Sequence, residues 1–238
     1  MKVGILAAGD TPPALKPDFG SYAQMLINLL SKADSTLEFE VFEVEHGVFP
    51  RSVDSCDAWA ITGSRHNVDD DYEWIATLRT LIHTIREQKK PLIGICFGHQ
   101  IMAQVMGADV GPAPKGWGLG VHTYQLNEPE IKSELGQTLS LNAVHQYQVL
   151  SQPEQSSVVA HSDFCPFAAL RYGDQMASFQ AHPEFLTRFE RTLLEHKKGE
   201  SFPEALTDQQ LQTLDDKTDA QSNAVGRWLA AFLKKRTA

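Results

Sequence analysis

The segment from Pro91 to Gln100 (PLIGICFGHQ) constrains the fold more than any other part of the chain. A short apolar run leads directly into Gly-x-Cys-x-Gly, centred on Cys96, and a stretch compatible with a helix follows. This order of strand, tight turn and helix is the thiol form of the nucleophile elbow. Gly94 and Gly98 leave room for the turn because neither carries a Cβ atom. The helix that follows directs its positive end at the sulfur, which favours the reactive thiolate.

A single cysteine is more often a buried core residue than a nucleophile. Cys96 differs because it stands at the end of an apolar strand, between two glycines and at the start of a helix. This placement favours the nucleophile over the core cysteine, although the pattern is shared by several α/β folds with a reactive thiol.

Strand and helix patterns alternate over the first half of the chain. We expect strands at 2–8, 37–44, 58–62 and 91–95, with 37–44 nearer a sheet edge, and helices at 22–30, 71–88 and 98–106. Such alternation predicts an α/β fold with a mostly parallel central sheet flanked by helices. Short strands with Gly and Pro between them follow over 110–180 and indicate added antiparallel strands, and a helix is expected at 185–196.

The length of 238 residues predicts one large domain with a small appendage. We expect residues 1–196 to form the α/β domain and residues 197–238 to form a C-terminal helical extension. The apolar stripe of Trp228, Leu229, Phe232 and Leu233 favours packing of that extension on the domain over an oligomerisation arm.

Composition excludes several classes of function. The net charge of −9 argues against a nucleic-acid partner, because phosphate binding needs a basic surface. The three cysteines are widely spaced and odd in number, which favours a reducing compartment over a disulfide framework. We find no signal-peptide pattern and no run of about 18 apolar residues, so a cytoplasmic protein without membrane contact is expected. No HExxH motif or Cys/His cluster is present, so no metal and no other cofactor is expected.

A nucleophilic cysteine needs a base, and His182 is the best candidate among nine histidines. Pro183 biases His182 toward an extended backbone. If the next residues continue it, Glu184 points the same way as His182 and can orient the imidazole, giving a Cys–His–Glu triad. The alternative is that His-Pro-Glu is only a turn that opens the next helix. Of the other histidines, His66 and His145 could line the site, and His99 is expected to pack or to bond locally. The rest are expected at the surface or in the core, namely His46, His83, His122, His161 and His196.

Together these residues resemble the class I, triad-type glutamine amidotransferases. Residues 94–100 (GICFGHQ) resemble their nucleophile segment, His182-Pro183-Glu184 resembles their His-x-Glu pair, and residues 61–64 (ITGS) resemble the loop that lines their oxyanion hole. The resemblance covers residues 2–185 and implies the flavodoxin-like fold of that family, with antiparallel strands added.

Within that family the chain is most similar to free-standing proteins of the GMP-synthase-like group, which includes plant γ-glutamyl peptide hydrolases. The segments 62–66 (TGSRH) and 144–149 (VHQYQV) resemble these proteins more than the synthase-attached domain. That domain usually carries Gly-Gly-Pro and Ser-His-Gly-Asp at the two places. Ser64 and Gln146-Tyr147 depart from it, which leaves the substrate preference open.

The resemblance implies a role for each matching residue. Cys96 is the nucleophile, His182 the general acid and base, and Glu184 the residue that orients His182. Backbone N–H groups of Phe97 and Ser64 would form the oxyanion hole. Substrate contacts are expected from three further residues, Gly63, Gln100 and His145.

Three functions remain open at this point. The first is hydrolysis of the glutamine side-chain amide through a γ-glutamyl thioester, with the ammonia passed to a separate synthetase chain. Only 53 residues follow Phe185, too few for a synthetase domain. The second is a self-contained γ-glutamyl peptide hydrolase. The third is a catalytically silent binding or thiol-sensing protein of the same fold, which an intact Cys96, His182 and Glu184 disfavours.

Overall fold

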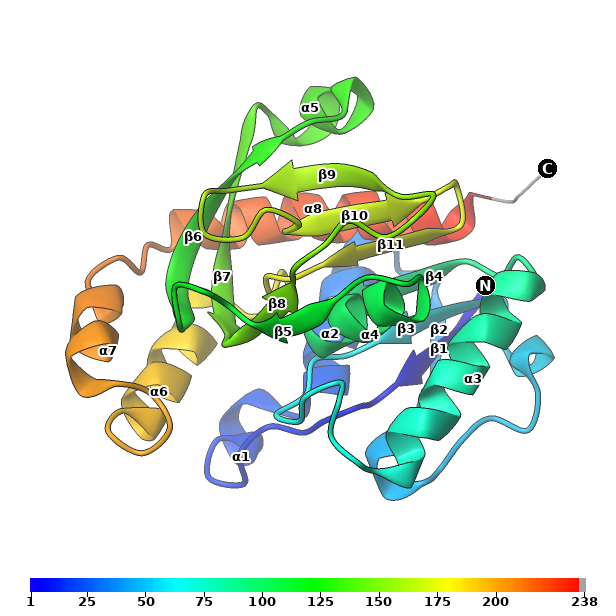
Figure 1. Cartoon of the computed structure of the whole chain (residues 1–238), viewed down its shortest axis with the longest axis horizontal. Helices are drawn as coiled ribbons and strands as arrows, with labels where there is room; N and C mark the ends of the chain where they lie inside the picture. The colour runs from blue at the N-terminus through cyan, green and yellow to red at the C-terminus, as the bar shows by residue number, and fades with distance from the viewer. Residues whose placement is uncertain (236–238) are drawn as a thin grey trace.

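The computed structural model describes residues 1–235, and its centre is a nine-stranded sheet in the order β2-β1-β3-β4-β11-β10-β9-β6-β7 (Figure 1). The first five strands in this order run parallel to one another. Their bounds are β1 Lys2–Leu6, β2 Glu38–Phe42, β3 Ala58–Ile61, β4 Leu92–Ile95 and β11 Met176–Phe179. The predicted position of the second strand at a sheet edge is confirmed, because β2 has a neighbour on one side only.

The other half of the sheet is antiparallel. It consists of β10 Ala169–Tyr172, β9 Ser157–His161, β6 Gly118–Leu126 and β7 Thr138–His145. A separate two-stranded sheet pairs β5 Val110–Pro112 with β8 Tyr147–Val149. The α/β fold with a mostly parallel sheet and added antiparallel strands is therefore confirmed.

Helices cover both faces of the parallel strands (Figure 1). The side chains of each strand alternate between two apolar clusters: Ile5 and Ala60 face one side, and Leu6 and Trp59 face the other. The first cluster is covered by α2 Tyr22–Ala33 and α8 Lys217–Lys234. The second is covered by α3 Glu73–Glu87 and α4 Phe97–Val105. The strands are buried on both faces, which explains their continuous apolar runs.

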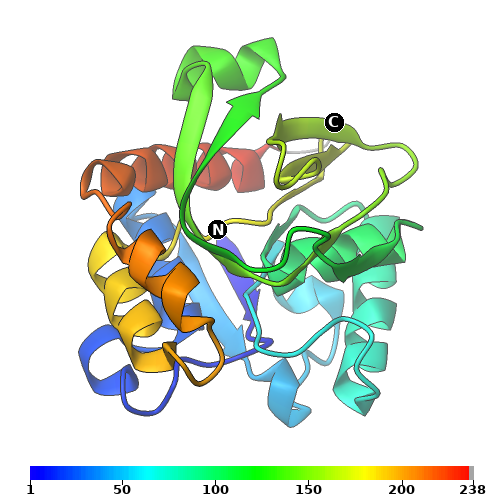
Figure 2. The same ribbon diagram turned by 60° about the vertical axis from the view of Figure 1, so that its left-hand side comes forward.

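A third apolar cluster lies beside the sheet, where chain segments far apart in sequence meet (Figure 2). It brings together α1 Lys16–Phe19, α6 Thr187–Lys197 and α7 Glu204–Leu211. The remaining elements are α5 Pro129–Leu135 and two 3-10 turns, Val44–His46 and Val53–Ser55. The predicted apolar stripe of the C-terminal segment faces the main sheet, since Trp228 of α8 packs edge-on against Phe179 with ring centroids 5.7 Å apart.

Several predicted boundaries shift by one to two residues. The first strand ends at Leu6 rather than at residue 8, because the chain then leaves the sheet and Ala8 N–H bonds the Thr62 hydroxyl at 3.0 Å. The helix after the elbow begins at Phe97, and the helix after His-Pro-Glu begins at Thr187. Within residues 1–235 no helix combines the length and apolar character that a membrane crossing requires.

Candidate active site

Cys96 lies at the carboxyl end of β4, where it is the N-terminal cap of α4. Its backbone has φ 51° and ψ −101°, in the left-handed half of the map that few residues other than glycine adopt. Such a conformation costs on the order of 1–3 kcal/mol and persists only where surrounding structure holds it. Two backbone hydrogen bonds do so: Cys96 N–H donates to the Phe179 carbonyl at 2.8 Å, and Gln100 N–H donates to the Cys96 carbonyl at 3.0 Å.

The two glycines of the motif are required by close contacts. A Cβ atom on Gly94 would lie 2.5 Å from Met102 Sδ and 2.6 Å from the Gly98 carbonyl carbon. A Cβ atom on Gly98 would lie 2.6 Å from the Ile61 carbonyl oxygen. The helix α4 can therefore pack directly against β4 and β3 only because both positions lack a side chain.

His182 and Glu184 form a buried pair beyond the end of β11. His182 Nδ1 and Glu184 Oε1 are 2.8 Å apart, and both side chains are nearly inaccessible to water. The His182 ring also stacks on Phe185, with centroids 3.9 Å apart and planes inclined by 9°. His182 N–H donates to the Asn142 carbonyl at 2.8 Å, which ties His182 to β7.

The backbone brings this pair together by a route that differs from the predicted one. The extended continuation through Pro183 is wrong: the chain turns at Pro183 and Glu184, and Phe185 N–H donates to the His182 carbonyl at 3.2 Å. The turn is the feature that the alternative interpretation expected, yet it directs Glu184 onto His182 instead of into the first turn of a helix, which begins only at Thr187.

Cys96 and His182 meet across the ends of β4 and β11, where both line one cavity. Burial alone would lower the pKa of His182, but the neighbouring Glu184 carboxylate and the Cys96 sulfur raise it well above its ordinary value. The arrangement therefore favours an imidazolium beside the sulfur, as a thiol nucleophile requires.

Ser64 and Gly63 lie close to this group. Ser64 lines the same cavity as Cys96 and His182. A Cβ atom on Gly63 would lie 2.9 Å from His182 Cε1 and 3.6 Å from Cys96 Cβ, so the loop after β3 passes directly over the reactive groups. Phe97, the other residue expected at the oxyanion hole, is the first residue of α4.

Gln100 and His145 also reach the site. Gln100 Nε2 donates to the Tyr147 carbonyl at 2.8 Å, and both Gln100 and Tyr147 line the cavity. His145 Nδ1 lies 3.1 Å from the same carbonyl oxygen. Burial lowers the pKa of His145 to about 3, with a further contribution from His122, so His145 is neutral and can offer a hydrogen bond but no charge.

Gln180 is a site residue that the motifs did not indicate. Its fully buried side chain donates from Nε2 to Cys96 Sγ at 3.7 Å and accepts from Gln100 Nε2 at 3.2 Å. The signal was an uncharged polar residue in the apolar run that precedes His182, where a buried amide needs hydrogen-bond partners.

A second buried carboxyl lies on the base side of the site. Glu190 of α6 is inaccessible to water, and its Oε1 accepts from Gly120 N–H at 3.3 Å. Burial raises the pKa of Glu190 to about 8, against the opposing charge of His182 and the Gly120 hydrogen bond. No motif marked this residue.

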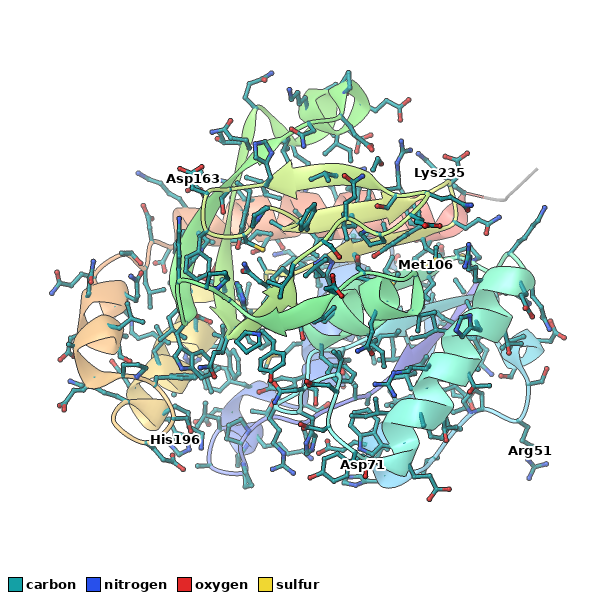
Figure 3. All side chains as sticks on the ribbon, viewed as in Figure 1. Arg51, Asp71, Met106, Asp163, His196 and Lys235 are labelled. Atoms are coloured by element: carbon teal, nitrogen blue, oxygen red, sulfur yellow. The ribbon has the colours of Figure 1, made fainter. Side chains whose placement is uncertain are left out.

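The other histidines divide between cavity, core and surface. His66 lines the cavity as expected, but so does His46, which the sequence placed with the surface and core residues. His99 packs in the core, one of the two roles expected for it, since it is fully buried; its hydrogen-bond partner is not local, because its Nδ1 lies 2.8 Å from Ser178 Oγ on β11. His196 lies near the end of α6, at the edge of the molecule (Figure 3).

The cavity has a volume of about 650 Å³ and extends well beyond Cys96 and His182. One end is polar and includes Glu45, whose Oε1 lies 3.3 Å from both Arg65 Nη2 and His66 Nε2. The opposite end is lined by apolar and aromatic side chains of the third cluster, together with Lys197. Over residues 1–235 we find no group of His, Cys, Asp and Glu side chains arranged to hold a metal ion.

This fold and this site define a class of protein: α/β proteins with a cysteine at a nucleophile elbow and a buried histidine–carboxylate pair beside it. Residues 15–198 match the family model described as glutamine amidotransferase class-I. The chain therefore belongs to the class I glutamine amidotransferase family, which is a family of enzymes.

Relatives of the chain carry three kinds of name. It is 29% identical over 179 residues to gamma-glutamyl peptidase 5 of Arabidopsis thaliana, covering 72% of this chain and 70% of that protein. It is 34% identical over 198 residues to a provisionally named glutamine amidotransferase of Saccharomyces cerevisiae, covering 77% of this chain and 78% of that protein. A shorter match, with 38% identity over 97 residues, is to one of the subunits of a glutamine-hydrolysing GMP synthase from Ignicoccus hospitalis. It covers 40% of this chain and 52% of that protein.

A solved structure shares the whole fold. A glutamine amidotransferase from Thermotoga maritima superimposes with a TM-score of 0.80 at 18% identity, covering 98% of this chain and 99% of that one. The family placement predicted from the motifs is confirmed, as is the similarity to γ-glutamyl peptidases and to a GMP synthase subunit.

Proposed function

We propose that this protein hydrolyses γ-glutamyl amides through a thioester on Cys96, with the side-chain amide of glutamine as the simplest substrate. The observation that carries the proposal is the strained Cys96 at the start of α4, in one cavity with a His182 that Glu184 holds in place. A silent binding protein would have no need to keep a strained nucleophile beside a buried charged pair.

The reaction follows from the positions of these groups. The Cys96 thiolate attacks the δ-carbonyl carbon, and the carbonyl π electrons move onto its oxygen. Collapse of this intermediate breaks the C–N bond, and the amine leaves with a proton from His182. A water molecule then gives a proton to His182 and attacks the thioester, which releases glutamate and returns the thiolate. Glu184 stabilises His182 whenever it is an imidazolium, before the amine leaves and after water gives its proton.

Backbone N–H groups of Phe97 and Ser64 are proposed to bind the oxyanion. Phe97 is the first residue of α4, where backbone N–H groups lack helical partners. Ser64 lies in the loop that passes over Cys96. In oxyanion holes of this kind, one such donor lowers the free-energy barrier by about 3–4 kcal/mol. Gly63, Gln100 and His145 are proposed to contact the glutamyl part.

An acceptor for the ammonia would be bound by a second chain. One relative is named as a subunit of a GMP synthase. This name supports the proposal that a synthetase chain is the partner. Such a partner would deliver the acceptor substrate, while the chain alone would release ammonia to water.

The test is hydrolysis of glutamine by the purified protein, with glutamate and ammonia measured, together with labelling by an electrophilic glutamine analogue. We expect stoichiometric labelling of Cys96 and loss of both activity and label in C96S. Cys56→Ser is the matched control, because Cys56 is also buried but lies outside the cavity. Labelling of Cys56 with Cys96 unmodified, or activity in C96S, would overturn the proposal.

A further inference from the structure

The cavity is larger than one amino acid requires. A volume of about 650 Å³ falls within the ~300–1,000 Å³ of sites that enclose drug-sized ligands. Glutamine would fill only part of it, and its leaving group, ammonia, needs almost no space. The extra volume can hold a larger leaving group at one of the two ends of the cavity.

The position of His182 decides which end receives the leaving amine. The amine takes its proton from His182, so the group attached to it must extend from Cys96 past the imidazole. The His182 ring stacks on Phe185 at 3.9 Å, and Phe185 in turn contacts Tyr22, with centroids 5.4 Å apart. Both aromatic rings belong to the third apolar cluster. The leaving group thus points to the apolar end of the cavity.

The polar end suits the other part of the substrate. A glutamyl group carries an ammonium and a carboxylate, which need charged or hydrogen-bonding partners when they leave water. Glu45, Arg65 and His66 supply such partners at the polar end. The apolar end offers Lys197 but few other such partners, so the glutamyl group is assigned to the polar end.

The apolar end is formed by α6, by the residues that follow it and by Trp117. Phe202 is buried and packs edge-on against Trp117 with centroids 5.0 Å apart, and Leu193 of α6 lies in the same cluster and lines the cavity. Lys197, at the end of α6, adds one cation, and its only ion pair among the described residues is with the exposed Glu200 at 3.0 Å. An exposed pair of this kind contributes little, so the ammonium is free to turn to a ligand carboxylate.

We propose that Trp117, Leu193, Lys197 and Phe202 bind the amine part of a γ-glutamyl dipeptide whose second residue carries a large apolar side chain and a free carboxylate. The aromatic rings take the apolar side chain and Lys197 takes the carboxylate. This inference rests on the proposed function, since it assumes that Cys96 attacks the γ-glutamyl carbonyl.

The experiment measures kcat/KM for glutamine, γ-glutamyl-glycine, γ-glutamyl-phenylalanine and γ-glutamyl-phenethylamide, the last being the phenylalanine compound without its carboxylate. We expect the wild-type protein to prefer γ-glutamyl-phenylalanine over glutamine and over γ-glutamyl-glycine by about tenfold or more, the range that apolar contacts in a pocket provide.

Two variants assign the preference to this end of the cavity. F202A should lower the preference for γ-glutamyl-phenylalanine over glutamine by about tenfold. K197M is at a partly exposed position where folding is not at risk, and it should lower kcat/KM for γ-glutamyl-phenylalanine several-fold more than for γ-glutamyl-phenethylamide. Leu206→Ala is the matched control, because Leu206 packs on the same cluster but does not line the cavity.

The outcomes separate this inference from the proposed function. Hydrolysis of glutamine without preference for γ-glutamyl-phenylalanine would overturn the inference alone. Equal losses on all four substrates in F202A and K197M would do the same. If no γ-glutamyl compound is hydrolysed and Cys96 resists the glutamine analogue, the proposed function and the inference fail together.

Discussion

The two halves of the candidate active site are held in place by different means. The Cys96 half is fixed by the backbone: a left-handed φ, a strand that runs straight into a helix, and two glycines in tight contact with their neighbours. The His182 half is fixed by side chains: a carboxylate at 2.8 Å and an aromatic ring stacked at 3.9 Å. Changes in the first half should therefore disturb both the fold and the activity, whereas changes in the second half should act mainly on the chemistry.

The largest effect is expected from C96S. The serine hydroxyl fits the elbow, but His182 is poised to stabilise a thiolate, and a hydroxyl is far harder to ionise. We expect kcat for glutamine to fall by a factor on the order of 10⁴ or more. Steady-state ammonia release measures the loss, and isothermal calorimetry should show that glutamine still binds. Residual activity within about tenfold of wild type would show that the nucleophile lies elsewhere.

Glu184→Gln should give the next largest loss, on the order of 10²–10⁴ in kcat, because the amide keeps the shape of the contact and removes the charge that stabilises the imidazolium. Glu184 raises the pKa of His182, so its replacement lowers that pKa. The alkaline limit of activity, where the imidazolium loses its proton, should move to lower pH. A pH profile of kcat/KM measures this shift, and an unchanged profile would assign Glu184 a structural role only.

The elbow glycines test the backbone half of the comparison. In G98A the new methyl group would approach the Ile61 carbonyl oxygen to 2.6 Å, so α4 must move away from the sheet. We expect the free energy of unfolding to fall by about 2–3 kcal/mol, with activity falling as well. Gly107→Ala is a useful control, because its left-handed φ makes it strained while nothing lies within 4 Å of the added methyl group. Urea denaturation distinguishes the two, and equal losses would show that steric contact at Gly98 is unimportant.

The smallest effect on activity is expected from E190Q, because Glu190 does not line the cavity, and its effect on stability depends on pH. Glu190 has a pKa of about 8 in the folded protein and an ordinary value of 4.5 when unfolded, so only the folded state keeps the proton between these values. The contribution of Glu190 to the free energy of unfolding is therefore complete below about pH 4.5 and is lost as the pH rises through about 8. Glutamine cannot titrate, so the stability of E190Q relative to wild type should rise across this window by up to about 1.4 kcal/mol per pH unit. Urea denaturation at several pH values measures the difference, and a constant difference would show that Glu190 is ionised in the fold.

The sequence made the Cys96 half predictable because its geometry is local. Ten consecutive residues contain the strand, both glycines and the helix start, and the packing that they require follows from the absence of two Cβ atoms. The pairing of His182 with Glu184 was also predicted, but by the wrong backbone path, because a turn and an extended segment can both bring residues two apart together. Gln180 and Glu190 were not predicted, since their roles depend on what lies opposite them.

The sequence by itself determined the parallel α/β core, the candidate nucleophile and the family, because apolar periodicity and a short glycine-flanked motif act over a few residues. Only the tertiary structure decided how large the cavity is, which of its ends is apolar, and that Phe202 and Lys197 line it beside Trp117. Trp117 and Phe202 are 85 positions apart in the chain, and their contact depends on α6 packing against β6, a long-range arrangement that no local pattern specifies.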